Sequence, residues 1–250
     1  ARLTDSGLNL HAVFEVAALP ATVRSALGSP DRPESHLRLL LVGHGGRALW
    51  RRVEAMRASL PTDHPIDAYS TQVIQDGLLA CYPEAHATFV YPQPLDVPLA
   101  VDLQLLGALA GWHHPAPFRV GINATWVAWF AYRALVLTDA PLVPTPRVES
   151  VAPCVSCSGR PCLVACPAGA LDAYAELFDL ARCLAYRLAP ESRCALTCRA
   201  RLACPVAPEH RYEDAQLAHS YGESLRMLKA WREAPWNDFS GTSARFVGEG

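Results

Sequence analysis

The chain has 250 residues, about half of them apolar, and a formal net charge of −2. This length permits one large domain or two small ones, and the near-neutral charge disfavours a general nucleic-acid-binding protein. The most apolar run, residues 120–138, is interrupted by Asn123, Thr125 and Arg133, so we expect no membrane-spanning helix.

The front of the chain alternates between helical and extended patterns. Strands are expected at four apolar or aromatic-rich runs: 37–43, 87–92, 118–123 and 126–138. Helices are expected at 19–28, at 64–83 with Asp63 as its cap, and at 97–114 with Gly111 at its end. These patterns together predict an α+β front.

Two details of the front have ordinary structural interpretations. The glycine-rich GHGG at 43–46 lacks the spacing of a dinucleotide-binding or P-loop motif, so we expect a tight turn there. Cys81 falls on the apolar side of the helix at 64–83, where a free cysteine in the core is expected.

Five side chains of the front are candidates for a cofactor or substrate pocket: His113, His114, Asn123, Trp126 and Arg133. Paired histidines can bind a ligand or metal, but they also suit a solvated helix end. The aromatic stripe that includes Trp126 suits a large flat ligand or simple core packing. Arg133 has the chemistry to hold a phosphate or carboxylate.

A proline-rich segment, 140–150, reads as a linker, and a cysteine-rich segment follows it. Eight of the nine cysteines lie between Pro153 and Pro205: Cys154, Cys157, Cys162, Cys166, Cys183, Cys194, Cys198 and Cys204. The first four form C-x2-C-x4-C-x3-C-P, two residues longer than the standard ferredoxin run, and the second run is looser but also ends in Cys-Pro. Eight thiolates are the number that two [4Fe–4S] clusters require.

The cysteine before proline serves the other cluster in two-cluster ferredoxins. Carried over by position, this predicts one cluster on Cys154, Cys157, Cys162 and Cys204, and the other on Cys166, Cys183, Cys194 and Cys198. Structural zinc, a relic domain without metal, and disulfides remain as alternatives. No signal peptide is apparent at the N-terminus, so we expect a reducing cytoplasm that keeps the thiols free.

Six arginines lie among these cysteines: Arg160, Arg182, Arg187, Arg193, Arg199 and Arg201. They are either ordinary surface charge, compensation for anionic clusters, or a docking surface for an acidic electron donor. A closing helix is expected at 210–232. The predicted domains are therefore a front at 1–145, a cluster domain at 146–232 and a polar tail at 233–250.

Three segments carry a resemblance to a known family: HPIDAYSTQVI, GINATWVAWFAYRALVL, and CVSCSGRPCLVACPAGAL with RCLAYRLAP. They resemble epoxyqueuosine reductases and corrinoid-dependent reductive dehalogenases, and the front is similar to cobalamin-processing proteins. The resemblance implies a nitroreductase-like front with a corrinoid or flavin pocket, and a ferredoxin-like rear with two four-iron clusters. This chain has Asn123-Ala124 where close relatives carry His-Pro, and no acidic residue matches the reductase's proton donor.

The sequence thus favours an iron–sulfur reductase that relays electrons to a corrinoid, a flavin or a small substrate in the front. Its partners would be an electron donor protein or small reductant and a small-molecule substrate, with pairing into a homodimer as in related fronts. A simple electron carrier without chemistry of its own and a structural cysteine domain remain as rival hypotheses. The size of the front, far larger than a ferredoxin needs, favours the reductase.

Overall fold

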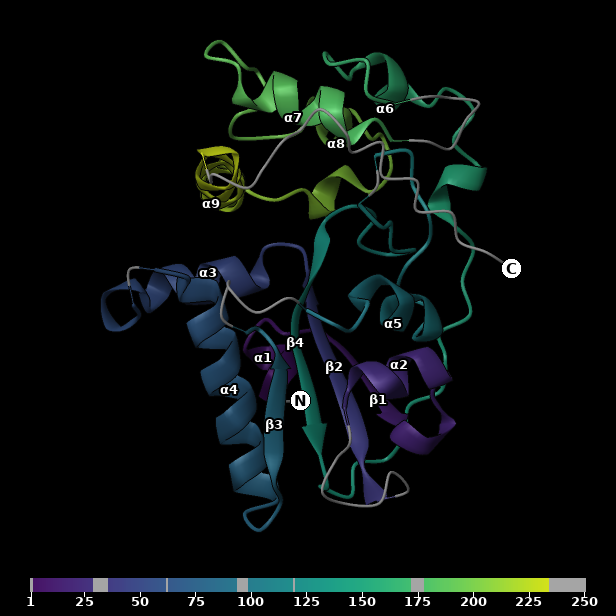
Figure 1. Cartoon of the computed structure of the whole chain (residues 1–250), viewed down its shortest axis with the longest axis vertical. Helices are drawn as coiled ribbons and strands as arrows, with labels where there is room; N and C mark the ends of the chain where they lie inside the picture. Colours follow the sequence, from purple (N-terminus) through teal and green to yellow (C-terminus); the bar gives the residue numbers. More distant parts are fainter. Residues whose placement is uncertain are drawn as a thin grey trace. The chain divides into compact units, whose positions relative to one another are not determined.

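The computed structural model describes residues 2–28, 36–61, 63–93, 99–118, 120–171 and 178–233 (Figure 1). The chain divides into two compact units. Unit 1 holds the described parts of 1–114, 121–153 and 209–211, and unit 2 holds those of 115–120, 154–208 and 212–250. No helix in these described ranges has the length and apolarity to cross a membrane. The domains predicted from the sequence remain predictions.

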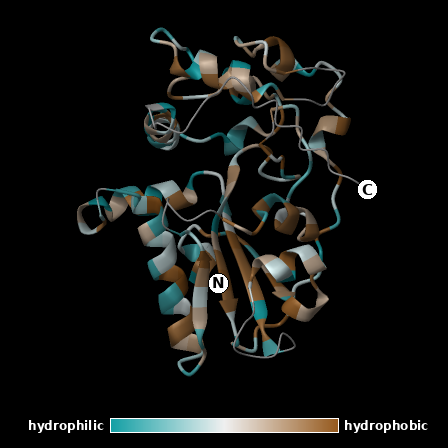
Figure 2. Cartoon of the chain, viewed as in Figure 1, coloured by the Kyte–Doolittle hydropathy of each residue, from teal (hydrophilic) through white to brown (hydrophobic). Residues whose placement is uncertain are grey.

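Unit 1 is built on a four-stranded antiparallel sheet with the order β1-β2-β4-β3. Its strands are β1 (Leu10–Glu15), β2 (Arg38–Gly45), β3 (Ala87–Tyr91) and β4 (Phe130–Thr138). The expected strands at 37–43 and 87–92 are confirmed by β2 and β3. Figure 2 shows the strands as largely hydrophobic, which agrees with a sheet that is covered on both faces.

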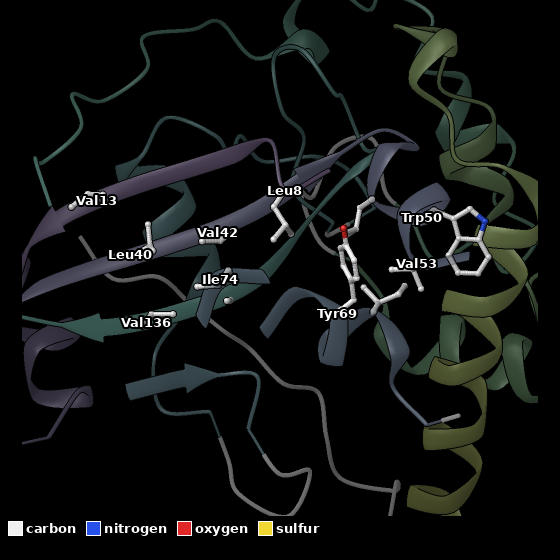
Figure 3. Close-up of a cluster of buried hydrophobic side chains, with 12 residues drawn as sticks. Leu8, Val13, Leu40, Val42, Trp50, Val53, Tyr69, Ile74 and Val136 are labelled. Atoms are coloured by element: carbon white, nitrogen blue, oxygen red, sulfur yellow. The ribbon is translucent and has the colours of Figure 1, made fainter. Parts of the chain in front are cut away.

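Helices pack on both faces of this sheet. On one face, α3 (Ala48–Ala55) and α4 (Pro65–Cys81) contribute Trp50, Val53 and Ile74 to a core with Leu40 and Val42 of β2 (Figure 3). On the other, α2 (Ala21–Ala26) and α5 (Leu103–Leu109) pack against its alternate residues, including Leu39 and Leu41. Because successive strand residues point to opposite faces, the unbroken apolar run of β2 serves both cores.

The expected strand at 118–123 is wrong, and the strand expected at 126–138 begins only at Phe130. Asn123 explains the difference, because its Oδ1 accepts hydrogen bonds from the backbone N–H groups of Thr125 and Trp126, both at 2.9 Å. Val127 has a φ of 54°, a left-handed conformation that also interrupts an extended chain. Asparagine side chains that bond the following backbone favour such turns.

The helix boundaries also differ from the expectation. His64, not Asp63, precedes the first turn of α4, with Pro65 at the first helical position. In the described part of the helix expected at 97–114, residues 99–114, the helix is α5. It begins after Asp102, whose side chain caps it by accepting from the N–H groups of Gln104 and Leu105.

Cys81 and the GHGG run at 43–46 both differ from the expectation. Cys81 is exposed rather than in the core, because it ends α4, whose residues 79–81 are all exposed. The GHGG run is mostly strand: β2 continues through Gly45, and only Gly46 adopts the positive φ of a turn, at 72°.

Unit 2 contains short helices joined by turns, followed by one long helix. They are α6 (Pro161–Val164), α7 (Leu180–Leu188), α8 (Arg199–Leu202) and α9 (Asp214–Glu233), and α9 matches the closing helix expected at 210–232. Within the unit, α6 packs against α8 and α7 packs against α9. The described residues also include α1 (Arg2–Asp5) and the 3₁₀ turns Val16–Ala18, Arg57–Ser59, Pro153–Val155 and Pro208–His210. The polar tail from 234 lies outside the described residues.

Candidate functional site

The first cysteine run is folded as a series of tight turns. Cys154 lies in the 3₁₀ turn Pro153–Val155, and the N–H of Cys157 donates to its carbonyl oxygen at 3.3 Å. Pro161 begins α6, which carries Cys162. Cys166 lies two residues after the end of this helix and donates its N–H to the carbonyl of Leu163 at 3.4 Å. Each turn reverses the chain, so thiols that are close in sequence can face different neighbours.

The second run uses helix ends in the same way. Cys183 lies in α7, whose first turn is capped by Asp179 through a hydrogen bond from the N–H of Arg182 at 2.9 Å. Cys198 is the residue before α8, and Cys204 follows that helix and donates to the carbonyl of Arg201 at 3.3 Å. Cys194 is held by a hydrogen bond from its N–H to the Ser192 hydroxyl at 3.1 Å.

One group of thiols combines residues of both runs. The pKa of Cys154 is raised by burial and, next, by the negative charges of Cys204, Cys162 and Cys157. The pKa of Cys162 is likewise raised by burial and then by the charges of Cys204 and Cys157. Like charges raise a pKa in this way only at short range. Cys204 therefore lies beside the first three cysteines of the first run, and we call these four residues the first cysteine group.

The other four cysteines form a second set of neighbours. Burial raises the pKa of Cys183 to about 11, with further contributions from the charges of Cys198, Cys166 and Cys194. The pKa of Cys194 is also raised by burial, and by the charges of Cys198 and Cys166. We call Cys166, Cys183, Cys194 and Cys198 the second cysteine group. The two groups share no member.

All nine cysteines are free thiols. Among the described residues, no three cysteine, histidine, aspartate or glutamate side chains converge closely enough to hold a single metal ion. A [4Fe–4S] cluster makes a different demand, because each of its four thiolates binds a separate iron. The assignment of the two groups as cluster ligands remains a prediction.

The paired histidines of unit 1 have separate partners. His113 Nδ1 is hydrogen-bonded to the Tyr132 hydroxyl at 3.2 Å, and burial lowers the pKa of His113. His114 Nε2 is hydrogen-bonded to the Ser150 hydroxyl at 2.9 Å. The His113 ring packs on Gly121, where an added Cβ would lie 2.0 Å from it. The structure therefore does not bring the two imidazoles to a common partner.

Asn123 and Trp126 are also engaged within the unit. The Asn123 amide nitrogen donates to the carbonyl of Trp112 at 3.1 Å, while its oxygen serves the turn described above. The Trp126 ring lies 4.5 Å, centre to centre, from the His210 ring and packs against Gly45. As binding residues these two remain predictions. In the described contacts they hold the loop that precedes β4.

Arg133 lies at an irregularity of the sheet. Val42 pairs with Ala134 and Gly43 with Tyr132, which leaves Arg133 as the extra residue of β4. Its Nε donates to His44 Nδ1 at 3.0 Å, and its guanidinium lies 3.6 Å from the Asp67 carboxylate on α4. A bulge that redirects a side chain is common next to functional sites.

Three residues around Arg133 were not predicted from the sequence to belong to a site. His44 is buried within β2, Asp67 lies in the first turn of α4, and Tyr91 ends β3. Burial raises the pKa of Tyr91, the charge of Arg133 lowers it, and the charge of Asp67 raises it. Tyr91 therefore lies near both Arg133 and Asp67. Arg133, which was expected to hold a phosphate or carboxylate, thus pairs with a carboxylate of this chain, that of Asp67. Nothing in the sequence pattern links three separate elements in this way.

We predict that Arg133→Met destabilises the chain by about 1–3 kcal/mol, because it leaves His44 Nδ1 and the half-buried Asp67 without this donor. Chemical denaturation measures the loss. Arg52→Met, at an exposed position of α3, is the matched control and should change the free energy of unfolding by less than about 0.5 kcal/mol. Equal stability of the two variants would show that the bulge does not depend on this cluster.

Comparisons with known proteins show which structures share this fold. No protein-family model matches the chain, and no curated protein matches it. The structure of an epoxyqueuosine reductase with a tRNA-Tyr epoxyqueuosine-modified stem loop is similar over 86% of this chain and 66% of its own, with a TM-score of 0.53 and 12% identity. The chain has the fold of this reductase. Our predicted α+β, nitroreductase-like architecture is confirmed at that level.

Two further structures are more distant. A C. elegans B12-trafficking protein, CblC, a homologue of human MMACHC, matches over 92% of both chains with 14% identity and a TM-score of 0.45. Epoxyqueuosine reductase from Bacillus subtilis matches over 71% of this chain with 14% identity and a TM-score of 0.46. The chain spans only half the length of that second reductase.

Proposed function

We propose that this chain is an iron–sulfur redox protein in which each cysteine group holds a [4Fe–4S] cluster. The clusters would relay electrons to a corrinoid, a flavin or a small substrate bound by unit 1. The observation that carries this proposal is the separation of eight thiols into two sets of four, with Cys204 in one set and Cys166 in the other. That crossing is the ligand pattern of two-cluster ferredoxins.

The chemistry of the donor set fits this group. Thiolates are the standard ligands of iron–sulfur clusters, and a bound cluster supplies one-electron transfer. The chain would contribute eight thiolates on short, turn-rich elements and the charges around them, which tune the affinity of a cluster for an electron. Because free thiols persist in reducing compartments, the proposal includes a cytoplasmic location.

Two observations support a reductase over a simple electron carrier. The fold is shared with an epoxyqueuosine reductase, and unit 1 has two cores of its own, which a carrier does not need. That reductase was captured with a tRNA stem loop. For this chain we propose a small-molecule substrate instead, because its net charge of −2 does not suit a polyanionic partner.

The proposed electron donor is an acidic protein or a small reductant. Val155 and Val164, beside cysteines of the first run, are 77% and 90% exposed, and Arg160 between them is also exposed. An apolar surface with positive charge suits a transient, negatively charged partner. Pairing of two chains into a homodimer remains a prediction.

The test is the iron and acid-labile sulfide content of protein purified without oxygen, with its visible spectrum. We expect about eight of each per chain and a broad brown absorbance that dithionite bleaches. Sharper additional bands would identify a corrinoid or flavin bound by unit 1. Zinc without sulfide would overturn the proposal in favour of a structural cysteine domain, and clusters without any ligand in unit 1 would favour the simple carrier.

A further inference from the structure

Arg187 is fixed beside the second cysteine group. From α7 its Nε donates to the carbonyl of Cys194 at 3.3 Å, and its terminal nitrogens donate to the Ser224 hydroxyl at 3.1 Å and the Tyr221 carbonyl at 3.3 Å. The guanidinium also lies over the Tyr221 ring, 5.3 Å from its centre. Four contacts hold this cation in one place, which distinguishes it from a mobile surface arginine.

A second arginine does not distinguish the two groups. Arg201 is only 8% exposed, and its guanidinium lies 4.9 Å from the centre of the Tyr212 ring. It follows Cys198 of the second group by three residues, but its carbonyl accepts a hydrogen bond from the N–H of Cys204 of the first group at 3.3 Å. The cation that is fixed at one group only is therefore Arg187.

The hydrogen bond to the Cys194 carbonyl fixes the Arg187 guanidinium beside a residue of the second group. The arginine of the first cysteine run is Arg160, which lies between Cys157 and Cys162 in the sequence. Arg160 is exposed, so water and salt screen its charge far more than that of a buried cation.

Burial of the cysteine side chains also differs between the two groups. Cys162 and Cys204 of the first group are both 8% exposed, whereas in the second group only Cys194 is buried to that degree. Burial disfavours the more highly charged state of a centre, and for a thiolate-ligated cluster this is the reduced state. The first group therefore has two thiols buried to this degree where the second has one, and the arginine of its cysteine run is exposed.

We infer that the second cysteine group holds the cluster of higher reduction potential, because Arg187 stabilises the negative charge that reduction adds. The inference rests on the proposed function. One electron from a one-electron reductant adds one negative charge to a cluster, and a fixed cation nearby lowers the free energy of that state. A single electron given to the chain would then reside at the second group, with the first group as the centre that is reduced last.

An anaerobic reductive titration followed by electron paramagnetic resonance tests this. Wild-type protein should give two midpoint potentials, and Arg187→Gln should move the higher one to more negative values while leaving the lower one in place. Arg160→Gln, the matched control at the first group, should leave the higher potential unchanged. A shift of only the lower potential in Arg187→Gln, or no shift, would overturn the inference.

Two further variants guard against a simple structural effect. Arg187→Lys retains the charge and should keep the higher potential closer to the wild-type value than Arg187→Gln does. Cys204→Ser, which should retain only the second cluster, should show one midpoint that matches the higher wild-type value. A match to the lower value would overturn the inference, while absence of iron from the wild-type chain would instead overturn the proposed function.

Discussion

The Cys204→Ser chain is expected to hold about half of the iron and sulfide of the wild-type protein, because the substitution removes one ligand from the first cysteine group only. Cys204 raises the pKa of both Cys154 and Cys162, so it lies among these thiols rather than with its sequence neighbour Cys198. Metal binding stabilises the fold that presents its ligands, so the thermal midpoint should fall as well. Iron, sulfide and thermal unfolding are measured on anaerobic protein.

Double variants separate the crossed arrangement from a simple run-by-run one. Cys162→Ser with Cys204→Ser removes two ligands of the same group, so this chain should also keep about half of its iron. Cys162→Ser with Cys166→Ser affects both groups, although the two residues lie in one short helix and its end, and should lose nearly all iron. The reverse result would mean that each run holds its own cluster.

The ninth cysteine provides the control. Cys81 is exposed at the end of α4 and belongs to neither group. Cys81→Ser should therefore retain the full iron and sulfide content and the wild-type thermal midpoint. A loss of iron in this variant would show that metal content follows general damage to the fold rather than particular ligands.

Much of the sheet could be predicted from local patterns. The run at 37–43 is apolar without alternation, which is typical of a strand buried on both faces, and β2 supplies residues to both cores. The region 118–129 could not be predicted in the same way. Its apolar composition suits a strand, but the Asn123 side chain folds it into a turn by accepting hydrogen bonds from the N–H groups of Thr125 and Trp126. The same side chain donates to the carbonyl of Trp112, eleven residues earlier.

The cysteine groups and the front pocket differ in what the sequence reveals. Spacing and the two Cys-Pro pairs predict which thiols share a cluster, because ligands can be carried over by position from two-cluster ferredoxins, and this assignment stays a prediction. The partners of Arg133 come from β2 and α4, and two of the partners of Arg187, Ser224 and Tyr221, come from α9. Contacts between elements that are distant in sequence leave no periodic signal, so these charged clusters appear only in the folded chain.

The Gly111→Ala variant is expected to lose about 2–5 kcal/mol of unfolding free energy, from two separate causes. Gly111 follows α5 with a φ of 78°, where a residue with a Cβ is strained. A Cβ at this position would also lie 1.9 Å from the carbonyl oxygen of Val148. That oxygen cannot move easily, because Val148 donates its N–H to the carbonyl of Ala110 at 3.0 Å.

Gly28→Ala separates the two causes. Gly28 ends α2 with the same φ of 78°, but nothing lies within 4 Å of the position that its Cβ would take. This variant should therefore lose only the conformational part, about 1–2 kcal/mol, in the same denaturation experiment. The difference between the two alanine variants measures how firmly the segment 145–150 is held in place. Val148 of this segment is bonded beside the end of α5, and Thr145 donates to the carbonyl of Val13 in β1 at 3.0 Å. Equal losses would mean that this segment shifts freely, and that the close approach at Gly111 contributes nothing to the stability of unit 1.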